Sequence, residues 1–200
     1  VLYPKTSAMS TVNREINGSY ETAHMQEVFI GTLDAHAKSH IDYELLFEDI
    51  LKESKADKGI LKCPNAKFRV IVIPCAYGLD AECAEILDAF SRSGGTVIFA
   101  GNIPEWTVAD NKRALLPLQL EKASSVPFKK RNEREFSLQL AGKILKHVTP
   151  KWSISGAGSE QVTATARKDK NGYLIFLANG TDEEKKFTLS HNLAGTTEIM

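Results

Sequence analysis

The clearest pattern in the chain is an uninterrupted apolar run at Val70–Ile73, followed by a second apolar run at Thr96–Ala100. Such runs are typical of strands that are covered on both faces, as in parallel sheets. Between them the spacing predicts an amphipathic helix with Asp80 as its N-cap and Gly94–Gly95 at its end. The predicted buried face of this helix carries Cys83, Ile86, Leu87 and Phe90. Residues 69–100 therefore predict one strand–helix–strand unit with a right-handed crossover.

Two further segments place apolar residues at helical spacing and predict helices that cover the sheet. The first is Glu21–Ala37, with Met25, Val28, Phe29 and Leu33 on one side. The second runs from Asn132 towards Val148, with Phe136, Leu140, Ile144 and Val148 on one side. Asn132 together with Glu135 is typical of a capping box. Asn111–Glu121 is predicted to be weakly helical.

The first third of the chain predicts short elements between these helices. Val1–Tyr3 is expected to be a strand closed by Pro4, and "HIDYELL" at His40–Leu46 a second short strand. Glu48–Ser54 has room for one or two helical turns. Lys58–Cys63 is expected to be extended.

The pattern changes at Lys151, where apolar and polar residues begin to alternate. Alternation of this kind predicts antiparallel strands, and Asn171-Gly172 lies where a two-residue hairpin turn belongs. A second Asn-Gly pair at Asn179-Gly180 predicts another turn. We therefore expect two regions: an α/β domain at residues 1–150 and, at 151–200, an antiparallel segment that begins a β-sandwich.

Composition narrows the classes of function. The chain has 200 residues, of which 42% are hydrophobic, and its 25 basic and 25 acidic residues cancel. A neutral chain has no global field that would favour nucleic acid or an anionic membrane, so we expect neither partner. No apolar run approaches the length of a membrane helix, and no signal peptide opens the chain. Because the chain begins inside a strand pattern, we expect it to be cut from something longer.

Three cysteines are present, and their spacing matches neither a disulfide framework nor a metal site. Cys75 follows the strand Val70–Ile73, where a nucleophile could lie. A catalytic thiolate needs a base within hydrogen-bond reach, and the only late histidines are His147 and His191. A small buried residue at a strand end is the interpretation that we favour for Cys75, and we expect no catalytic residue in this chain.

Two other groups of polar residues have ordinary explanations. His36 and His40 are four residues apart, but without a following glutamate the pair is more typical of a polar helix end than of a metal site. We expect no metal and no cofactor. Four acidic residues gather early in the chain, where we expect a solvated surface rather than a glycosidase carboxylate pair; they are Asp42, Glu44, Glu48 and Asp49.

Open α/β sheets bind ligands at the carboxyl ends of their strands. The candidates for ligand or interface contacts at that edge are Ser7, Tyr77, Asn102 and Trp106. The hydroxyl of Ser7 could donate to a phosphate, although no glycine-rich loop surrounds it. The rings of Tyr77 and Trp106 could stack on a sugar, but packing against a neighbouring domain is the interpretation that we favour.

Several stretches together resemble a known family. They are "YPKTSA", "HIDYELL", "FRVIVIP", "ILDAFSRSGGTVIFAG" and "NGYLIFLANGTDEEKKFTL". They resemble the C-terminal part of large bacterial glycoside hydrolases, which follows the catalytic barrel; in bacterial β-galactosidases the similar segment is called the trimerisation domain. The resemblance covers nearly the whole chain, and rests on a scaffold pattern rather than on a catalytic signature.

The resemblance implies a flavodoxin-like, or class I glutamine-amidotransferase-like, fold: a mostly parallel three-layer sandwich followed by a short antiparallel β segment. In true amidotransferases the nucleophile lies in an elbow that corresponds here to Gly101–Ile103, where no cysteine stands. The resemblance therefore implies a noncatalytic domain of a secreted or periplasmic bacterial glycosidase. Its partners would be the catalytic barrel, a second copy of itself or a carbohydrate. The alternatives are a free-standing amidotransferase-like or cysteine-hydrolase enzyme that uses Cys75, and a sugar- or nucleotide-binding module.

Overall fold

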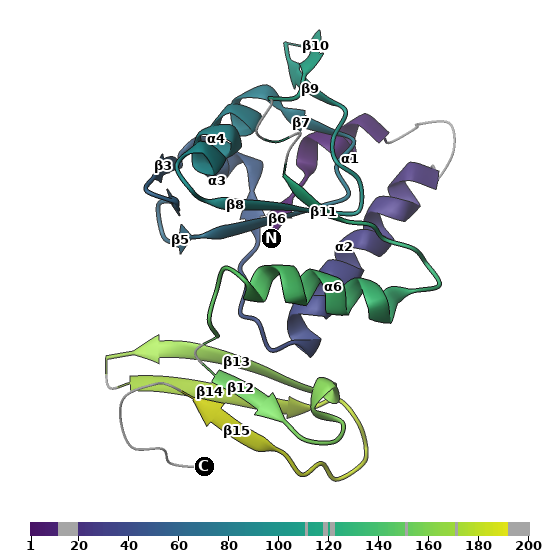
Figure 1. Ribbon diagram of the computed structural model, residues 1–200, viewed down its shortest axis with the longest axis vertical. Helices are drawn as coiled ribbons and strands as arrows, with labels where there is room; N and C mark the ends of the chain where they lie inside the picture. Colours follow the sequence, from purple (N-terminus) through teal and green to yellow (C-terminus); the bar gives the residue numbers. More distant parts are fainter. Residues whose placement is uncertain are drawn as a thin grey trace.

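The computed structural model describes residues 1–11, 20–110, 112–117, 120, 123–150, 152–170 and 172–191 (Figure 1). Two parts follow one another along the chain. The α/β part, up to residue 150, contains β1 (Leu2–Tyr3), α1 (Lys5–Thr11), α2 (Tyr20–Lys38), β2 (Leu46–Phe47), α3 (Glu48–Lys52), β3 (Lys55–Asp57), β4 (Ile60–Lys62), β5 (Lys67–Phe68), β6 (Val70–Pro74), β7 (Gly78–Asp80), α4 (Ala81–Arg92), β8 (Thr96–Ala100), β9 (Trp106–Ala109), β10 (Lys112–Leu115), β11 (Ser124–Val126) and α6 (Glu133–Leu145). The β segment, from residue 152, contains β12 (Trp152–Ser155), the 3-10 turn Ser159–Gln161, β13 (Val162–Asp169), β14 (Gly172–Asn179) and β15 (Thr188–His191).

Parallel strands form the centre of the α/β part. β6, β8 and β11 pair in the order β11–β8–β6, and β1 pairs with β2. β1 lies beside β6 and contacts it. The predicted strand–helix–strand unit is confirmed, since β6 and β8 are parallel neighbours joined by α4.

Alternate residues of the central strands face two separate helix layers. Ile71, Ile73, Val97 and Phe99 pack with α4 and α3 in one core cluster. Val72, Ile98 and Ala100 pack with α2 and α6 in the other. Because both faces are covered, β6 and the β8 residues after Thr96 are apolar at successive positions, which produces the uninterrupted runs in the sequence.

The predicted boundaries of α4 are confirmed. Asp80 is the N-cap, and its side chain accepts a hydrogen bond from the Cys83 backbone N–H at 3.2 Å. After the helix, Gly94 has a φ of +97°, a conformation that glycine adopts at little cost. At the start of α6, Asn132 is also the N-cap, but its side chain donates to the Glu135 carboxylate and accepts no capping hydrogen bond from the helix backbone. The helix ends at Leu145, three residues before Val148.

Two predictions about short elements are wrong, and the expectation that Lys58–Cys63 is extended is right only in part, because Lys58 and Gly59 form a turn with positive φ before β4. The second strand does not begin at His40, because His40 has a φ of +53° and belongs to the end of α2. The Ile41 N–H donates back to the His36 carbonyl at 2.9 Å, which closes a helix-ending turn. Where weak helix was expected, Lys112–Leu115 is strand β10, paired antiparallel with β9. Residues 111, 118, 119 and 121 of that expected helix lie outside the described residues.

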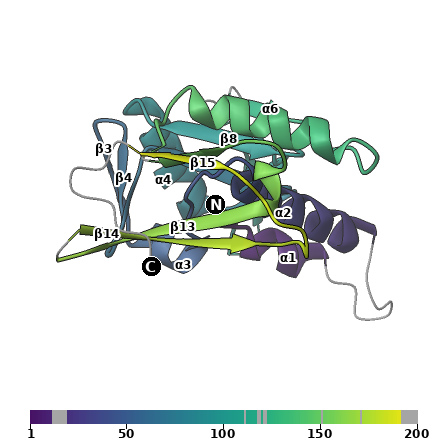
Figure 2. The same ribbon diagram turned by 90° about the horizontal axis from the view of Figure 1, so that it is seen from below.

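The antiparallel pattern predicted after Lys151 is confirmed. β13 pairs with β14, and β12 pairs with β15, around a small core of Trp152, Ile154 and Val162. Gly172 pairs with Asp169 and so lies in the strand, although the prediction placed it in the two-residue turn; residue 171 lies outside the described residues. At the second predicted turn, Asn179 Oδ1 accepts from the Thr181 N–H at 3.1 Å. Seen from below, β13 passes beside α2, so the β segment contacts the α/β part (Figure 2).

Candidate functional site

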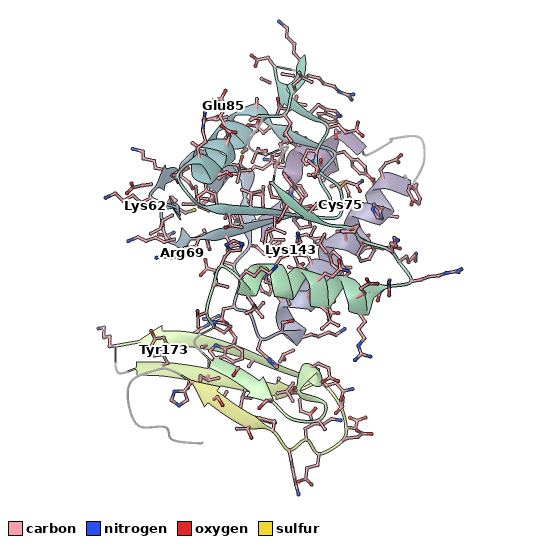
Figure 3. All side chains as sticks on the ribbon, viewed as in Figure 1. Lys62, Arg69, Cys75, Glu85, Lys143 and Tyr173 are labelled. Atoms are coloured by element: carbon pink, nitrogen blue, oxygen red, sulfur yellow. The ribbon has the colours of Figure 1, made fainter. Side chains whose placement is uncertain are left out.

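The loop after β6 holds Cys75 in a strained and buried position (Figure 3). Its φ is +24°, its exposed fraction is 0%, and its N–H donates to the Ala100 carbonyl at 2.7 Å. A positive φ at a residue with a side chain often marks a functional turn. The groups around the sulfur therefore indicate whether Cys75 could act as a nucleophile.

Burial raises the pKa of the Cys75 thiol, while the Tyr77 hydroxyl and the Asn102 backbone N–H act in the opposite direction. Neither late histidine supplies a base. The Nδ1 of His147 lies 3.2 Å from the Thr96 hydroxyl, at the other end of β8, and His191 pairs with Trp152 in the β segment. A covered thiol with a raised pKa is a poor nucleophile, because the thiolate is the species that attacks.

Ser7 lies directly beneath the loop that follows Cys75. Its hydroxyl donates to the Gly78 carbonyl at 2.8 Å, and accepts from the N–H groups of Tyr77 and Gly78 at 2.8 and 2.9 Å. The side chain has an exposed fraction of 0%. Every hydrogen-bonding site of the hydroxyl is occupied inside the protein, so this geometry assigns Ser7 to holding the loop.

Trp106 packs against the same loop. A Cβ added to Gly78 would lie 1.9 Å from the indole Cζ3, so the ring rests directly on this glycine. The Arg113 guanidinium lies 4.3 Å from the ring centroid, in cation–π contact. Tyr77 is half-buried, with its pKa raised to about 12, mainly by burial, and Asn102 is exposed. The structure thus brings the four sequence candidates together at one edge, where Ser7, Tyr77 and Trp106 take part in the loop contacts and Asn102 contacts Cys75 through its backbone N–H.

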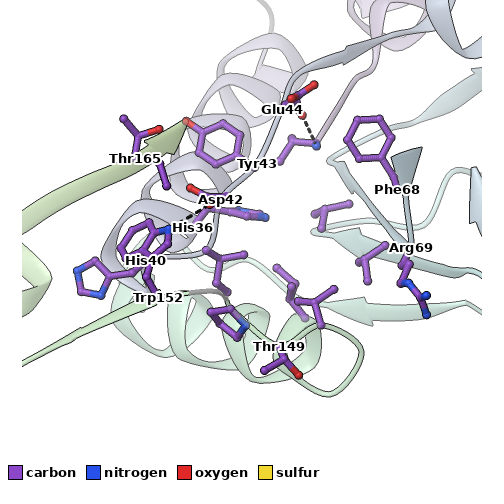
Figure 4. Close-up of a pocket in the computed structure, with 18 of the residues that line it drawn as sticks. His36, His40, Asp42, Tyr43, Glu44, Phe68, Arg69, Thr149, Trp152 and Thr165 are labelled. Atoms are coloured by element: carbon purple, nitrogen blue, oxygen red, sulfur yellow. Dashed lines mark hydrogen bonds between the residues drawn. The ribbon is translucent and has the colours of Figure 1, made fainter. Parts of the chain in front are cut away.

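A groove of about 940 Å³ lies at the opposite, amino ends of the strands, between the α/β part and the β segment (Figure 4). We call it the interdomain groove. Its lining comes from the end of α2 and the following loop, from β5 and the start of β6, from the end of α6 and from the β segment. Sequence reasoning missed it, because each segment contributes only a few residues.

The loop His40–Glu44 forms the floor of the interdomain groove. Asp42 Oδ2 accepts from the Trp152 indole N–H at 3.2 Å, and the Glu44 carbonyl accepts from the Val1 nitrogen at 2.8 Å. Tyr43 is 41% exposed, and its ring packs against that of His36 with centroids 5.2 Å apart. Burial lowers the pKa of His36 to about 4, so this imidazole is neutral at pH 7.

His40 joins the two parts. Its Nε2 lies 3.1 Å from the Ser159 carbonyl and 3.0 Å from the Val162 carbonyl, and its ring lies 5.8 Å from that of Trp152. His36 bonds elsewhere, with Nδ1 2.7 Å from the Thr32 carbonyl. The two histidines, although four residues apart, therefore make contacts with different partners.

The acidic cluster is not uniformly solvated, which corrects the expectation for Glu48. Glu48 is buried, and both of its oxygens accept from the Thr6 N–H at 3.1 Å. Burial raises its pKa, against the hydrogen bonds from Thr6. The carboxylate caps the start of α1, while Asp42, Glu44 and Asp49 are exposed as expected.

Among the described residues no group of three metal-type side chains comes together, and no helix has the length and apolarity of a membrane span.

Comparison with known proteins gives a structural relative but no sequence family. The sequence matches no protein-family model and no curated protein. Among solved structures the chain resembles the apo exo-carrageenase GH42 from Bacteroides ovatus, with a TM-score of 0.55 and 19% sequence identity. The match covers 96% of this chain and 24% of that one, so this chain spans about a quarter of the enzyme's length. At this identity the likeness shows a shared fold.

Proposed function

We propose that this chain is a noncatalytic accessory region of a multidomain glycoside hydrolase, which supports the catalytic barrel or a subunit interface. The observation that carries the proposal is the burial of Cys75, whose thiol has a raised pKa, while the two late histidines, His147 and His191, make their contacts elsewhere. The structural match supports the parent class, since nearly all of this chain corresponds to a quarter of a GH42 enzyme.

The proposed architecture is a flavodoxin-like domain at 1–150 followed by the start of a β-sandwich at 151–200. The strand pairing supports the first part, because β2–β1 and β6–β8–β11 lie side by side in the order 2-1-3-4-5 of doubly wound sheets. The separate core of the β segment supports the second.

The rival function is a free-standing enzyme that uses Cys75 as its nucleophile. The positive φ of Cys75 is the observation that favours this rival function. The complete burial of Cys75 opposes it, and the internal bonds of Ser7 and the packing of Trp106 hold the loop that follows Cys75 in place.

The test is to incubate the purified chain with aryl glycosides of several sugars and, separately, with glutamine and peptide substrates. We expect no turnover, and Cys75→Ser should behave as the wild-type chain does. Hydrolysis above background that is lost in Cys75→Ser would establish the rival. The gene sequence upstream of Val1 gives an independent check, because the proposal requires it to encode a catalytic barrel.

A further inference from the structure

We infer that the interdomain groove binds an anionic saccharide, a sugar chain that carries sulfate or carboxylate groups. The inference rests on the proposed link to glycoside hydrolases. It concerns a different surface from the crevice at the carboxyl ends of the strands, where the sequence candidates lie.

The groove has the size of a ligand site. Its volume of about 940 Å³ is near the upper end of the range for small-molecule sites, roughly 300–1,000 Å³. Two aromatic rings, Tyr43 and Phe68, stand on opposite sides of it (Figure 4). Aromatic rings in a ligand site offer apolar faces at low entropic cost, which suits the apolar face of a pyranose ring.

Tyr43 is preorganised for such a contact. Its ring rests against the neutral His36, which is itself fixed by its bond to the Thr32 carbonyl, while two-fifths of the residue stays exposed. A ring that is already ordered loses little freedom when a ligand binds.

Three cations around the groove indicate the charge of the ligand. Lys67 and Arg69 come from the β5–β6 region and Arg167 from β13, and all three are exposed. Within the described part of the chain none of them forms an ion pair. An arginine can bind a sulfate or a carboxylate through two hydrogen bonds, and the Asp42 and Glu44 carboxylates can accept from sugar hydroxyls.

Isothermal titration calorimetry on the full chain tests the inference with four probes. They are a sulfated galactan tetrasaccharide, a uronic acid tetrasaccharide, a neutral galactotetraose and inorganic sulfate. We expect at least one anionic tetrasaccharide to bind about tenfold more tightly than galactotetraose and sulfate, a difference of ~1.4 kcal/mol. The two anionic probes distinguish sulfate from carboxylate recognition.

Substitutions locate the binding. Tyr43→Ala and Arg69→Gln should each weaken the binding of the anionic probe about five- to tenfold. The matched controls Tyr20→Ala and Arg134→Gln change an exposed tyrosine and an exposed arginine away from the groove, and should leave it unaltered. Circular dichroism should show that all four variants are folded, since each side chain is exposed.

Three results would overturn the inference: no binding of any tetrasaccharide at about 5 mM, equal binding of sulfate alone, or binding that both groove substitutions leave intact. If galactotetraose bound as tightly as the anionic tetrasaccharides, the groove would not require an anionic ligand, and this result would also contradict the inference. Absence of binding leaves the accessory role standing, whereas glycoside hydrolysis by the chain would refute that role whatever the calorimetry shows.

Discussion

Replacing Ser7 by alanine should destabilise the whole α/β part, although Ser7 is one small polar residue on a seven-residue helix. Its hydroxyl joins three backbone groups of Tyr77 and Gly78, all at 2.8–2.9 Å. In Ser7→Ala two N–H groups and one carbonyl lose their partner in a buried place, at a cost of about 1–3 kcal/mol for each group left unsatisfied. Because neighbouring losses are not additive and water can enter, we expect about 3 kcal/mol in total.

Urea denaturation and calorimetry measure this loss. For a chain of this size, ~3 kcal/mol lowers Tm by about 6–12 °C. Ser10→Ala is the matched control, since this exposed residue donates a single part-buried hydrogen bond to the Ser7 carbonyl at 2.9 Å, and it should cost less than ~1 kcal/mol. The loosened loop should also expose Cys75, so native-state labelling of this thiol should accelerate in Ser7→Ala. A loss below ~1 kcal/mol with unaltered labelling would refute the structural role of Ser7.

Three further predictions concern single residues. Native Cys75 should react with iodoacetamide only as fast as the protein opens, because burial raises its pKa, and rapid alkylation below pH 7 would contradict this. His40→Ala should release the β segment, seen as faster proteolysis after Pro150 than in His147→Ala, because two carbonyls lose their donor; equal rates would exclude this role. Burial holds the pKa of His36 at about 4, below the ~6.5 of the unfolded chain, so the unfolded state binds the extra proton in this interval. Stability should therefore fall, by up to ~3 kcal/mol, as pH drops from 6.5 to 4, and His36→Gln should flatten that fall in urea titrations.

The sequence predicted the parts of the fold that rest on long periodic patterns. β6, α4 and β8 were correct in type and nearly in boundary, because both sheet faces are covered and the helix has a cap and a glycine end. β10 was missed because Lys112–Leu115 has no strand periodicity, with all four residues exposed, and only pairing with β9 makes it a strand. Strands of two residues, such as β2, are too short to show any period.

The candidate site, like the fold, could be predicted from the sequence only in part. The predicted strand ends placed Tyr77, Asn102 and Trp106 at one edge of the sheet, because parallel strands end at a common edge. The sequence could not show that Gly78 receives the Trp106 ring, because that contact depends on the pairing of β7 with β9. Nor could it show the interdomain groove, which forms only when β13 lies beside α2. The one signal was the polar and aromatic run His40–Tyr43, which was taken for a strand.

The contacts of that run have a consequence for protein engineering. His40 and Asp42 lie two residues apart, and through Ser159, Val162 and Trp152 they fix how the β segment attaches. A chimaera that exchanges residues from 151 onward for those of a structural relative would lose these bonds unless the incoming sequence supplies an indole for Asp42 and places two backbone carbonyls beside the imidazole. Without them, the attachment would depend on the packing of α2 against β13 and against the Ser159–Gln161 turn.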